Sequence, residues 1–243
     1  MTTLLGRNVL ITGGTKGIGR CTALAFARAG ANVLVCSRRD DEAARQTAAE
    51  LAETGGKHHV TTADVTQAEQ VAELASECAR QFGSLDVLVN NVGTISQVPF
   101  SELPAAEWRR VIDVNLTAAF LVTQAALPLL SKDASIIYLG SRAAVAGVPL
   151  RAHYAAAKAA LVGLTRSLCK ELGPAGIRVN VIYPSIVETD ETRQVLGPAL
   201  DRFRKQAALG RLACPQDIAD TVLFLAGPAS SYLNGQVLQV DGG

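Results

Sequence analysis

Short apolar runs rich in β-branched residues alternate along the chain with segments whose apolar positions follow a helical period. The runs lie at residues 8–12, 32–36, 58–62, 85–90, 134–140, 177–183 and 236–240. Such runs are typical of strands that are buried on both faces of a parallel sheet. The pattern therefore predicts an α/β fold, a doubly wound parallel sheet of about seven strands with helices on both faces. Sheets of this kind bind ligands at the carboxyl ends of their strands, where the strand order reverses.

The first predicted strand leads directly into a glycine-rich turn. Residues 8–12 are followed by Gly13-Gly14-Thr15-Lys16-Gly17-Ile18-Gly19 and then by a helical pattern from about Arg20 to Ala29. Glycines permit a tight turn and a close approach of ligand, and the N-terminus of a helix attracts phosphate. The spacing G-x-x-x-G-x-G differs from the G-x-G-x-x-G fingerprint, so an ordinary turn between strand and helix is an alternative.

A second candidate site lies in the other half of the chain. Tyr154 and Lys158 are four residues apart in a long helical pattern, and Ser141 follows an apolar strand. Positions i and i+4 share one face of a helix, so the Lys158 ammonium is expected to lower the pKa of the Tyr154 phenol. A tyrosine tuned in this way can act as an acid or a base. The alternative is a packed ring beside a solvated charge.

Composition is consistent with one domain over residues 1–243. The chain is 49% hydrophobic and 19% charged, with no linker, repeat or charge block, and it is long enough to bury a sizeable core. A net charge of +1 with 5% aromatic residues argues against nucleic-acid binding. The apolar stretch 118–130 is too short to span a bilayer, and the N-terminus lacks the pattern of a signal peptide. We therefore expect a cytoplasmic protein without a membrane segment.

The cysteines and histidines indicate neither disulfides nor a metal site. The five cysteines are scattered singly and are odd in number, without C-x-x-C spacing, at Cys21, Cys36, Cys78, Cys169 and Cys214. Reduced thiols in a cytoplasm fit this pattern better than a disulfide framework or a zinc site. The histidines form no cluster either, because His153 stands apart from His58 and His59.

Taken in order, the motifs resemble the classical short-chain dehydrogenase/reductase family over the whole chain. They are TGGTKGIG at 12–19, DV at 64–65, NNVG at 90–93, Asn115 in DVNLT, Ser141, YAAAK at 154–158 and YPSIVET at 183–189. Two departures concern the nicotinamide and substrate end, because Val92 replaces the usual Ala and Ser185 the usual Gly. The segments GRLACPQDIA and GQVLQVDGG resemble 3-oxoacyl-(acyl carrier protein) reductases. Such a reductase usually has a basic residue near Ala175, so a free small or secondary-metabolite ketone is an equal alternative.

The resemblance implies an NADPH-dependent oxidoreductase that reduces a ketone or 3-oxo substrate to a secondary alcohol by hydride transfer. It implies that Tyr154 is the general acid, that Ser141 orients the substrate oxygen and that Lys158 tunes Tyr154 and holds the nicotinamide ribose. It also implies that Asn115 holds a water that links Lys158 to solvent. The cofactor-binding residues that it implies are Gly13, Thr15, Lys16, Gly17, Ile18, Gly19, Ser37, Arg38, Asp64, Val65, Asn90, Gly93, Tyr154, Lys158, Pro184, Val187 and Thr189.

The preference for NADPH/NADP⁺ over NADH/NAD⁺ is predicted from the charged residues that follow the second predicted strand. Where an NAD enzyme has an acidic residue for the ribose, this chain reads Ser37-Arg38, and a guanidinium suits a 2′-phosphate. Lys16 can add a second positive charge there, whereas Arg39 can equally pair with Asp40, Asp41 or solvent. Two other functions stay open: an NAD(P)-linked sugar or steroid alcohol dehydrogenase, and a non-catalytic NADPH-sensing regulator.

Three further expectations concern partners and specificity. The helices at 155–172 and 116–130 are apolar enough to pack against a second copy, so we expect a homotetramer or homodimer. The amphipathic segment 190–210 is expected to be a mobile substrate loop. Arg142 is expected to be solvated or at an interface, with an acidic group of the substrate as the alternative.

Overall fold

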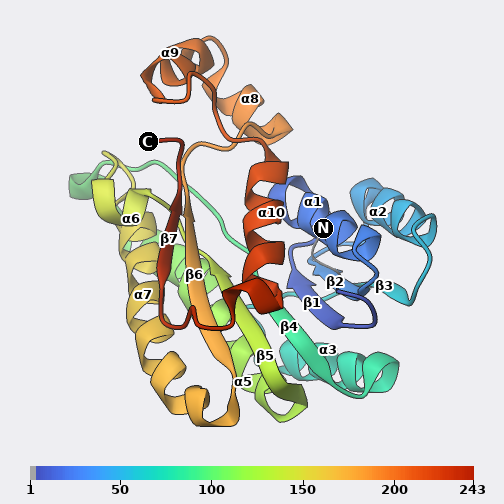
Figure 1. Cartoon of the computed structure of the whole chain (residues 1–243). Helices are drawn as coiled ribbons and strands as arrows, with labels where there is room; N and C mark the ends of the chain where they lie inside the picture. Colours follow the sequence, from blue (N-terminus) through green and yellow to red (C-terminus); the bar gives the residue numbers. More distant parts are fainter. Residues whose placement is uncertain (1–3) are drawn as a thin grey trace.

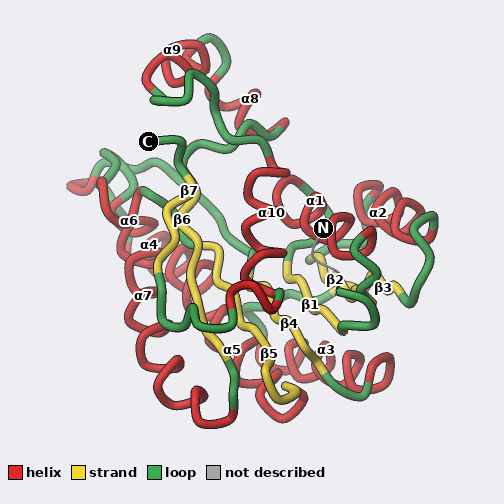
Figure 2. Tube along the Cα trace, viewed as in Figure 1, coloured by secondary structure: helices red, strands yellow, loops and turns green. Residues whose placement is uncertain are grey.

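A computed structural model describes residues 4–243 of the chain. Seven parallel strands form one sheet in the order β3-β2-β1-β4-β5-β6-β7, and Figure 2 shows them side by side. The strands are β1 (Asn8–Thr12), β2 (Asn32–Ser37), β3 (His58–Thr62), β4 (Leu85–Asn90), β5 (Leu130–Leu139), β6 (Arg178–Pro184) and β7 (Val237–Val240). The predicted fold is confirmed. The order reverses between β1 and β4, so the carboxyl ends of these two strands form the predicted ligand-binding edge.

Helices cover both faces of the sheet. They are α1 (Gly17–Arg28), α2 (Glu42–Ala52), α3 (Ala68–Phe82), α4 (Ala105–Ile112), α5 (Ala118–Ala126), α6 (Ala143–Ala146), α7 (Ala152–Leu172), α8 (Asp190–Leu196), α9 (Ala199–Gln206) and α10 (Pro215–Ala226). Shorter turns are a π-helical turn (Asp113–Thr117) and 3₁₀ turns (Phe100–Glu102, Leu127–Leu129, Gly173–Ala175 and Pro228–Ser230). One layer contains α1, α2 and α10, and the other contains α3, α5 and α7 (Figure 1).

The two layers explain why the strands are apolar without alternation. In β1, Val9 and Ile11 pack in the core cluster with α1 and α10, whereas Leu10 packs in the cluster with α3 and α5. The same period of two continues in β5, where Ile136 faces one layer and Ile137 the other. Successive side chains of a strand point to opposite faces, and here both faces are core.

One predicted strand begins earlier than the sequence pattern indicated. β5 starts at Leu130, which pairs with Leu85 of β4, and not at the apolar run that begins at residue 134. The intervening residues are polar, and Asp133 has a positive φ of 65°. The first part of the strand therefore lacks the apolar signal.

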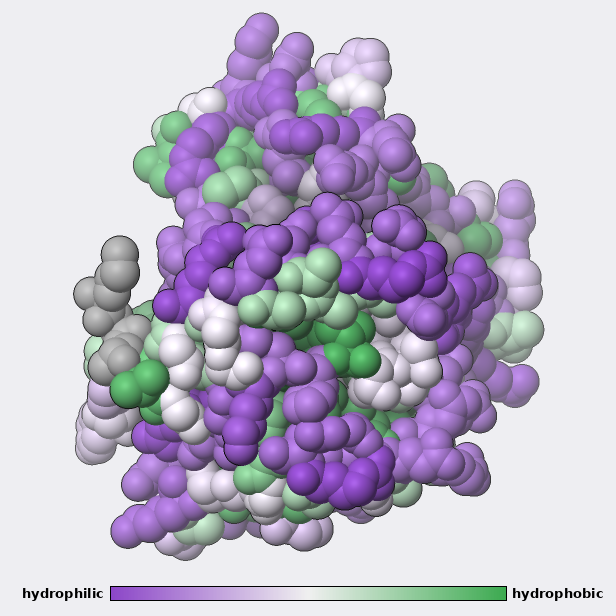
Figure 3. All heavy atoms as spheres, turned by 90° about the vertical axis from the view of Figure 1, so that its right-hand side faces the viewer, coloured by the Kyte–Doolittle hydropathy of each residue, from purple (hydrophilic) through white to green (hydrophobic). Residues whose placement is uncertain are grey.

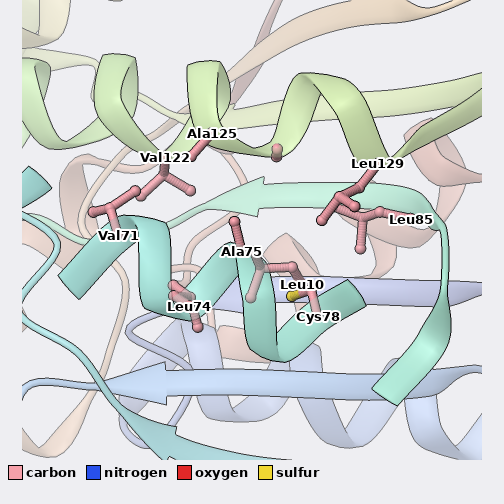
Figure 4. Close-up of a pocket in the computed structure, with 10 residues that line it drawn as sticks. Leu10, Val71, Leu74, Ala75, Cys78, Leu85, Val122, Ala125 and Leu129 are labelled. Carbon is pink, nitrogen blue, oxygen red and sulfur yellow. The ribbon is translucent and has the colours of Figure 1, made fainter. Parts of the chain in front are cut away.

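The space between α3 and α5 is a packing gap in the core. It measures about 10 Å³, roughly the volume occupied by one water. Figure 4 shows its apolar lining, which includes Leu10 of β1, Leu85 of β4 and the thiol of Cys78. A space of this size and polarity holds no ligand, so the functional site lies elsewhere.

A helical run from Ala105 to Leu129 has the length and apolar composition of a membrane-spanning helix. The structure joins α4, the π-helical turn, α5 and the 3₁₀ turn Leu127–Leu129 into these 25 residues, whereas the sequence analysis considered only 118–130. Within the fold, Val111, Ala118 and Val122 of this run are buried. The run packs against α3 and α7, and this packing accounts for the apolar side chains on its buried face.

Arg178 of β6 fixes the end of α10 from inside the protein. Its guanidinium donates to the carbonyl of Leu225 at 2.8 Å and to the carbonyl and hydroxyl of Ser230 at 3.1 and 3.0 Å. The side chain is buried. It therefore places a buried positive charge against carbonyl groups at the negative end of α10, where the hydroxyls of Ser135 and Ser230 also donate to the Leu225 carbonyl.

Arg178→Met is expected to lower the free energy of unfolding by about 1.5–3 kcal/mol, because it removes buried hydrogen bonds from a charged donor, although the Leu225 and Ser230 carbonyls keep other donors. Urea unfolding followed by circular dichroism measures the change. The matched control is Arg202→Met on the exposed surface of α9, for which we expect a change within about 0.5 kcal/mol. Equal effects of the two substitutions would show that Arg178 has no structural role.

Candidate active site

The glycine-rich turn is held in place by Asn91, which follows β4, the neighbour of β1 in the sheet. Gly13 and Gly17 have positive φ values of 65° and 52°, which favour glycine. A Cβ on Gly19 would lie 2.2 Å from the carbonyl oxygen of Gly13. The Asn91 side chain donates to the carbonyls of Thr12 and Gly13, both at 3.0 Å. The turn is thus preformed at the β1–β4 switch point.

The N-terminus of α1 is free to bind an anion. Asp41 caps α2 by accepting from the Ala44 N–H at 3.1 Å, but the Lys16 side chain makes no such bond to α1. The first turn of α1 also contains no acidic residue. Unpaired N–H groups and the positive end of the helix dipole together suit the pyrophosphate of a dinucleotide.

Two predicted residues of this turn are packed inward. Thr15 is buried, and its carbonyl accepts from the Thr47 hydroxyl at 3.3 Å. Ile18 is partly buried against the core on the α1 side of the sheet. These contacts attach the turn to α2 and to the core, while the backbone of the turn stays at the carboxyl end of β1.

The charged side chains after β2, where the adenosine ribose is expected, are not arranged as predicted. The prediction had Lys16 and Arg38 both facing a 2′-phosphate. The Lys16 ammonium contacts the Asp41 carboxylate at 2.6 Å, and this bond lowers the pKa of Asp41. Within residues 4–243, Arg38 has no carboxylate at ion-pair distance. The Ser37 hydroxyl donates to the carbonyl of Arg39 at 2.8 Å. Arg39 likewise forms no ion pair within the described residues, so both exposed arginines are unpaired after β2, whereas Lys16 is already paired.

Asp64 and Val65 follow β3 beside this position. The Asp64 carboxylate accepts from the hydroxyl and the N–H of Thr66 at 2.7 and 3.0 Å. The Thr66 hydroxyl, with a smaller contribution from the Arg38 charge, holds the pKa of Asp64 below its usual value. Val65 is buried in the core. The Asp64 carboxylate and the Arg38 guanidinium are thus close enough to interact electrostatically, just after the carboxyl ends of β3 and β2.

The two asparagines of the NNVG motif have different environments. Asn90 is buried, and its amide donates to the Thr123 hydroxyl at 3.2 Å, which in turn contacts the Tyr138 hydroxyl at 2.9 Å. Its side chain therefore points into the core below the edge. Asn91, to which the sequence analysis assigned no role, is the residue that fixes the glycine-rich turn.

Lys158 lies at the centre of the candidate catalytic group. Its ammonium donates to the carbonyl of Leu139, at the end of β5, at 2.8 Å. Burial lowers its pKa to about 8, so the ammonium form still predominates at neutral pH. A Cβ on Gly93 would lie 3.3 Å from this ammonium and 2.9 Å from the Asn115 carbonyl oxygen. The loop after β4 can pass here only because Gly93 has no side chain.

Asn115 sits in the π-helical turn between α4 and α5. Its amide donates to the carbonyls of Val111 and Thr94 at 2.8 and 2.9 Å, and its oxygen accepts from the Thr94 N–H at 3.2 Å. The amide thus bonds to the carbonyl of the residue four positions earlier, a contact by which polar side chains compete with helical backbone bonds. Through its bonds to Thr94, Asn115 also binds the loop that carries Gly93.

Tyr154 is buried to 8% exposure in the first turns of α7, with the half-buried Ser141 after β5. The expected lowering of its pKa by Lys158 is wrong. Burial of the phenol raises the pKa of Tyr154, and the Ser141 hydroxyl and the Arg151 charge offset this only in part. The Lys158 ammonium instead bonds to Leu139 and lies 6.0 Å from the centre of the tyrosine ring.

A buried hydrogen-bond chain next to Tyr154 was missed in the sequence. The His153 Nε2 lies 2.7 Å from the Ser96 hydroxyl, which also bonds to the Glu107 carboxylate. The Arg110 guanidinium and the Ser96 hydroxyl lower the pKa of Glu107 to about 2, so the serine donates to an ionised acceptor. His153 must then donate from Nε2. The chain joins α4, the loop after β4 and α7, and a single histidine in the sequence gave no signal of it.

The segment after β6 lies against the glycine-rich turn. Val187 pairs with Ala213, and the Thr189 hydroxyl caps α8 by accepting from the Thr192 N–H at 3.1 Å. The methyl carbon of Thr189 would be 3.5 Å from a Cβ on Gly17. The turn predicted to bind phosphate and the segment implied for the nicotinamide end are therefore adjacent.

Two other regions border this segment. Pro184 is the last residue of β6, and its carbonyl accepts from the Arg142 N–H at 2.9 Å. The Arg142 side chain forms an ion pair of 3.5 Å with Asp241, an intramolecular partner that the sequence analysis did not consider. The segment 190–210 forms α8 and α9, which project from the rest of the molecule in Figure 1.

Known proteins with similar sequences cover the whole chain. A model of the family described as enoyl-(acyl carrier protein) reductase matches residues 13–243. A 3-oxoacyl-(acyl-carrier-protein) reductase of Synechocystis sp. is 37% identical over 246 aligned residues, which cover 100% of this chain and 98% of the relative. One from Thermotoga maritima is 36% identical over 244 residues, covering 99% and 98%.

Solved structures agree with these sequence matches. A short-chain dehydrogenase/reductase described as glucose/ribitol dehydrogenase, from Brucella melitensis, has a TM-score of 0.94 at 36% identity and covers 100% of this chain and 98% of its own. A blue fluorescent protein from a metagenomic library, solved in complex with NADPH, has a TM-score of 0.93 at 33% identity, with coverage of 99% and 98%.

Proposed function

Because this chain belongs to the short-chain dehydrogenase/reductase family, we propose that it is an NADPH-dependent ketoreductase that converts a ketone or 3-oxo substrate to a secondary alcohol. As a family member it is an oxidoreductase that uses a nicotinamide cofactor. The observation that carries the proposal is the placement of Tyr154, Ser141 and Lys158 at the same sheet edge as the preformed glycine-rich turn.

The proposed chemistry assigns one task to each side chain. NADPH, when bound, supplies the hydride for the carbonyl carbon. Tyr154 donates its proton to the carbonyl oxygen as the general acid, and Ser141 donates a hydrogen bond to the same oxygen. The raised pKa of Tyr154 keeps its proton in place at neutral pH, which is the state required for reduction. Lys158 and Asn115 support this group, Lys158 with a positive charge and Asn115 by positioning the loop at Gly93.

The remaining residues would hold the cofactor at the edge. We assign the pyrophosphate to the turn from Gly13 to Gly19 and the 2′-phosphate to Arg38. The backbone after β3 and β4, at residues 64–65 and 90–93, would border the adenosine. The segment 184–189 would contact the carboxamide, although the Thr189 hydroxyl also caps α8. We further propose that residues 1–243 act as one catalytic domain in the cytoplasm, with 190–210 bordering the substrate.

A reductase of carbon–carbon double bonds is the second candidate, because the matching family model carries that description. The purified protein should oxidise NADPH in the presence of 3-oxoacyl-N-acetylcysteamine thioesters or simple ketones. The 2-enoyl thioester of the same chain length is the discriminating control. Turnover of the enoyl compound alone would replace the proposed reaction with the second one.

The cofactor assignment predicts the effect of Arg38→Asp. The substitution removes a charge-assisted contact of about 1.5–3 kcal/mol, so the preference for NADPH over NADH should fall at least about tenfold. The new carboxylate also repels a 2′-phosphate. The ratio of kcat/KM for the two cofactors measures the effect, and Arg39→Asp is the matched control with the same change in charge. If both substitutions change the ratio equally, Arg38 makes no specific contact.

We also propose that the protein is a homotetramer or a homodimer through the α4–α5 and α7 side. Trp108 of α4 and Phe120 of α5 are 38% and 45% exposed, which is costly without a partner. Figure 3 shows that the side carrying α2 is mostly hydrophilic. Sedimentation velocity at micromolar concentration should give a mass of two or four chains, and a monomer would contradict the assignment.

A further inference from the structure

Arg151 is a half-buried cation without a partner, one helical turn before Tyr154. It occupies the N-cap position of α7. Its Nε is enclosed and bonds to no other group of the described chain. Across residues 4–243, no carboxylate lies at ion-pair distance from its guanidinium.

Three other arginines near the segment 184–210 have carboxylate partners, whereas Arg38, exposed at the expected ribose position, has none within residues 4–243. Arg142 pairs with Asp241, and both Arg193 and Arg204 pair with Glu188. A guanidinium that is partly removed from water loses solvation, and proteins normally compensate with a carboxylate or with carbonyl groups. Arg151 has neither, so its counter-ion is expected from outside the chain.

The backbone at Arg151 is held in a costly conformation. Leu150 has a positive φ of 67°, which costs a residue with a side chain roughly 1 kcal/mol or more. The carbonyl of Leu150 accepts from the Val98 N–H at 2.9 Å, and this bond attaches it to the loop after β4. Strain of this kind is concentrated at ligand-binding positions.

The guanidinium acts on the same small volume as the catalytic tyrosine. Residues three apart on a helix are neighbours, with about 5–6 Å between their Cβ atoms. The Arg151 charge lowers the pKa of Tyr154 against the effect of burial. Arg151 is therefore a nearby cation for a charged group of a substrate whose carbonyl oxygen contacts Tyr154.

We infer that Arg151 binds a carboxylate of the substrate, so that the physiological substrate is a free 2- or 3-oxo acid and not a thioester on a carrier protein. The inference rests on the proposed ketoreductase function. A guanidinium offers two parallel N–H donors to a carboxylate, whereas a thioester at the same position is neutral. The absence of a basic residue at Ala175 agrees with a substrate that is not attached to a carrier.

The test compares acids with neutral analogues that differ only at the carboxylate. 3-Oxobutanoate and 2-oxobutanoate are each measured against their ethyl esters, and 3-oxobutanoyl-N-acetylcysteamine is included as the thioester. For the parent enzyme we expect the kcat/KM of at least one acid to exceed that of its ester about tenfold or more. Arg151→Gln should abolish this preference, mainly through KM, and Arg151→Lys should retain part of it.

The readout is the kcat/KM for an acid divided by the kcat/KM for its ester. Arg151 also affects the pKa of Tyr154, and that effect changes the rates with acid and ester together, so the ratio does not respond to it. Arg28→Gln at the exposed end of α1 is the control for loss of a positive charge and should leave the ratio unchanged. Reduction of esters or thioester without a preference for either acid would overturn the inference and leave the ketoreductase proposal intact. If none of the carbonyl compounds supports NADPH oxidation, both are wrong.

Discussion

Tyr154→Phe is expected to reduce turnover by at least about 100-fold while NADPH still binds. The substitution removes the transferable proton, and a general acid contributes roughly 10²- to 10⁴-fold to a rate. The phenylalanine ring can occupy the same buried space beside Ser141. Steady-state kinetics would measure turnover, and quenching or enhancement of NADPH fluorescence would measure binding.

Tyr138→Phe is the matched control for this substitution. Tyr138 is also buried, and its hydroxyl contacts Thr123 in the core below the sheet edge. Loss of this hydroxyl should cost about 1 kcal/mol of stability without an effect on turnover. Residual activity of Tyr154→Phe above about a tenth of the parent would remove Tyr154 from the mechanism.

Gly19→Ala should weaken NADPH binding by about 100-fold, because the glycine-rich turn cannot accept a Cβ without opening. The added atom would lie 2.2 Å from the carbonyl oxygen of Gly13 and 2.5 Å from the Asn91 amide nitrogen. Both atoms belong to the bonded group that preforms the turn, and overpacking costs about 1–3 kcal/mol. Fluorescence titration with NADPH measures the loss.

Gly173→Ala provides the control for this prediction. A Cβ there would meet only the Asn234 amide nitrogen at 3.6 Å, an ordinary contact in the turn after α7. Its NADPH affinity should equal that of the parent. Equal affinities for Gly19→Ala and the parent would show that the turn does not hold the cofactor.

The strands and the sheet could be predicted from the sequence because burial on both faces leaves a direct record in composition. The bounds of β1, β3 and β4 agree with the apolar runs. β5 was the exception, because its first residues pair at the exposed end of the sheet, where polar side chains such as Lys132 are accommodated. Hydrophobic periodicity cannot find a strand segment that is not in the core.

The site could be predicted only as far as its residues occur in local motifs. Tyr154 and Lys158 are related by helical spacing, but the orientation of the ammonium toward the Leu139 carbonyl depends on a strand elsewhere in the chain. The pairing of Lys16 with Asp41 likewise depends on how α2 begins. Sequence spacing gives proximity, whereas the sign of a pKa shift depends on burial and on competing partners.

Asn91 and Arg151 illustrate a second limit. Asn91 stands beside Asn90 in one motif, yet the alternation of β4 sends one side chain to the core and leaves the other at the glycine-rich turn. Arg151 combines an enclosed Nε that has no partner with a guanidinium that forms no ion pair within the described residues, whereas Arg20, whose Nε is also enclosed, pairs with Glu50. Neither property can be read from residue type and spacing.

Isotope transfer tests the central claim most directly. The parent enzyme is incubated with NADPH carrying deuterium at both C4 positions of the nicotinamide and with 3-oxobutanoate or its ethyl ester, and the product is analysed by mass spectrometry and NMR. The account predicts one deuterium on the carbon that bears the new hydroxyl, formed by the parent and lost with Tyr154→Phe. A product without deuterium at that carbon, or equal transfer by Tyr154→Phe, would contradict it.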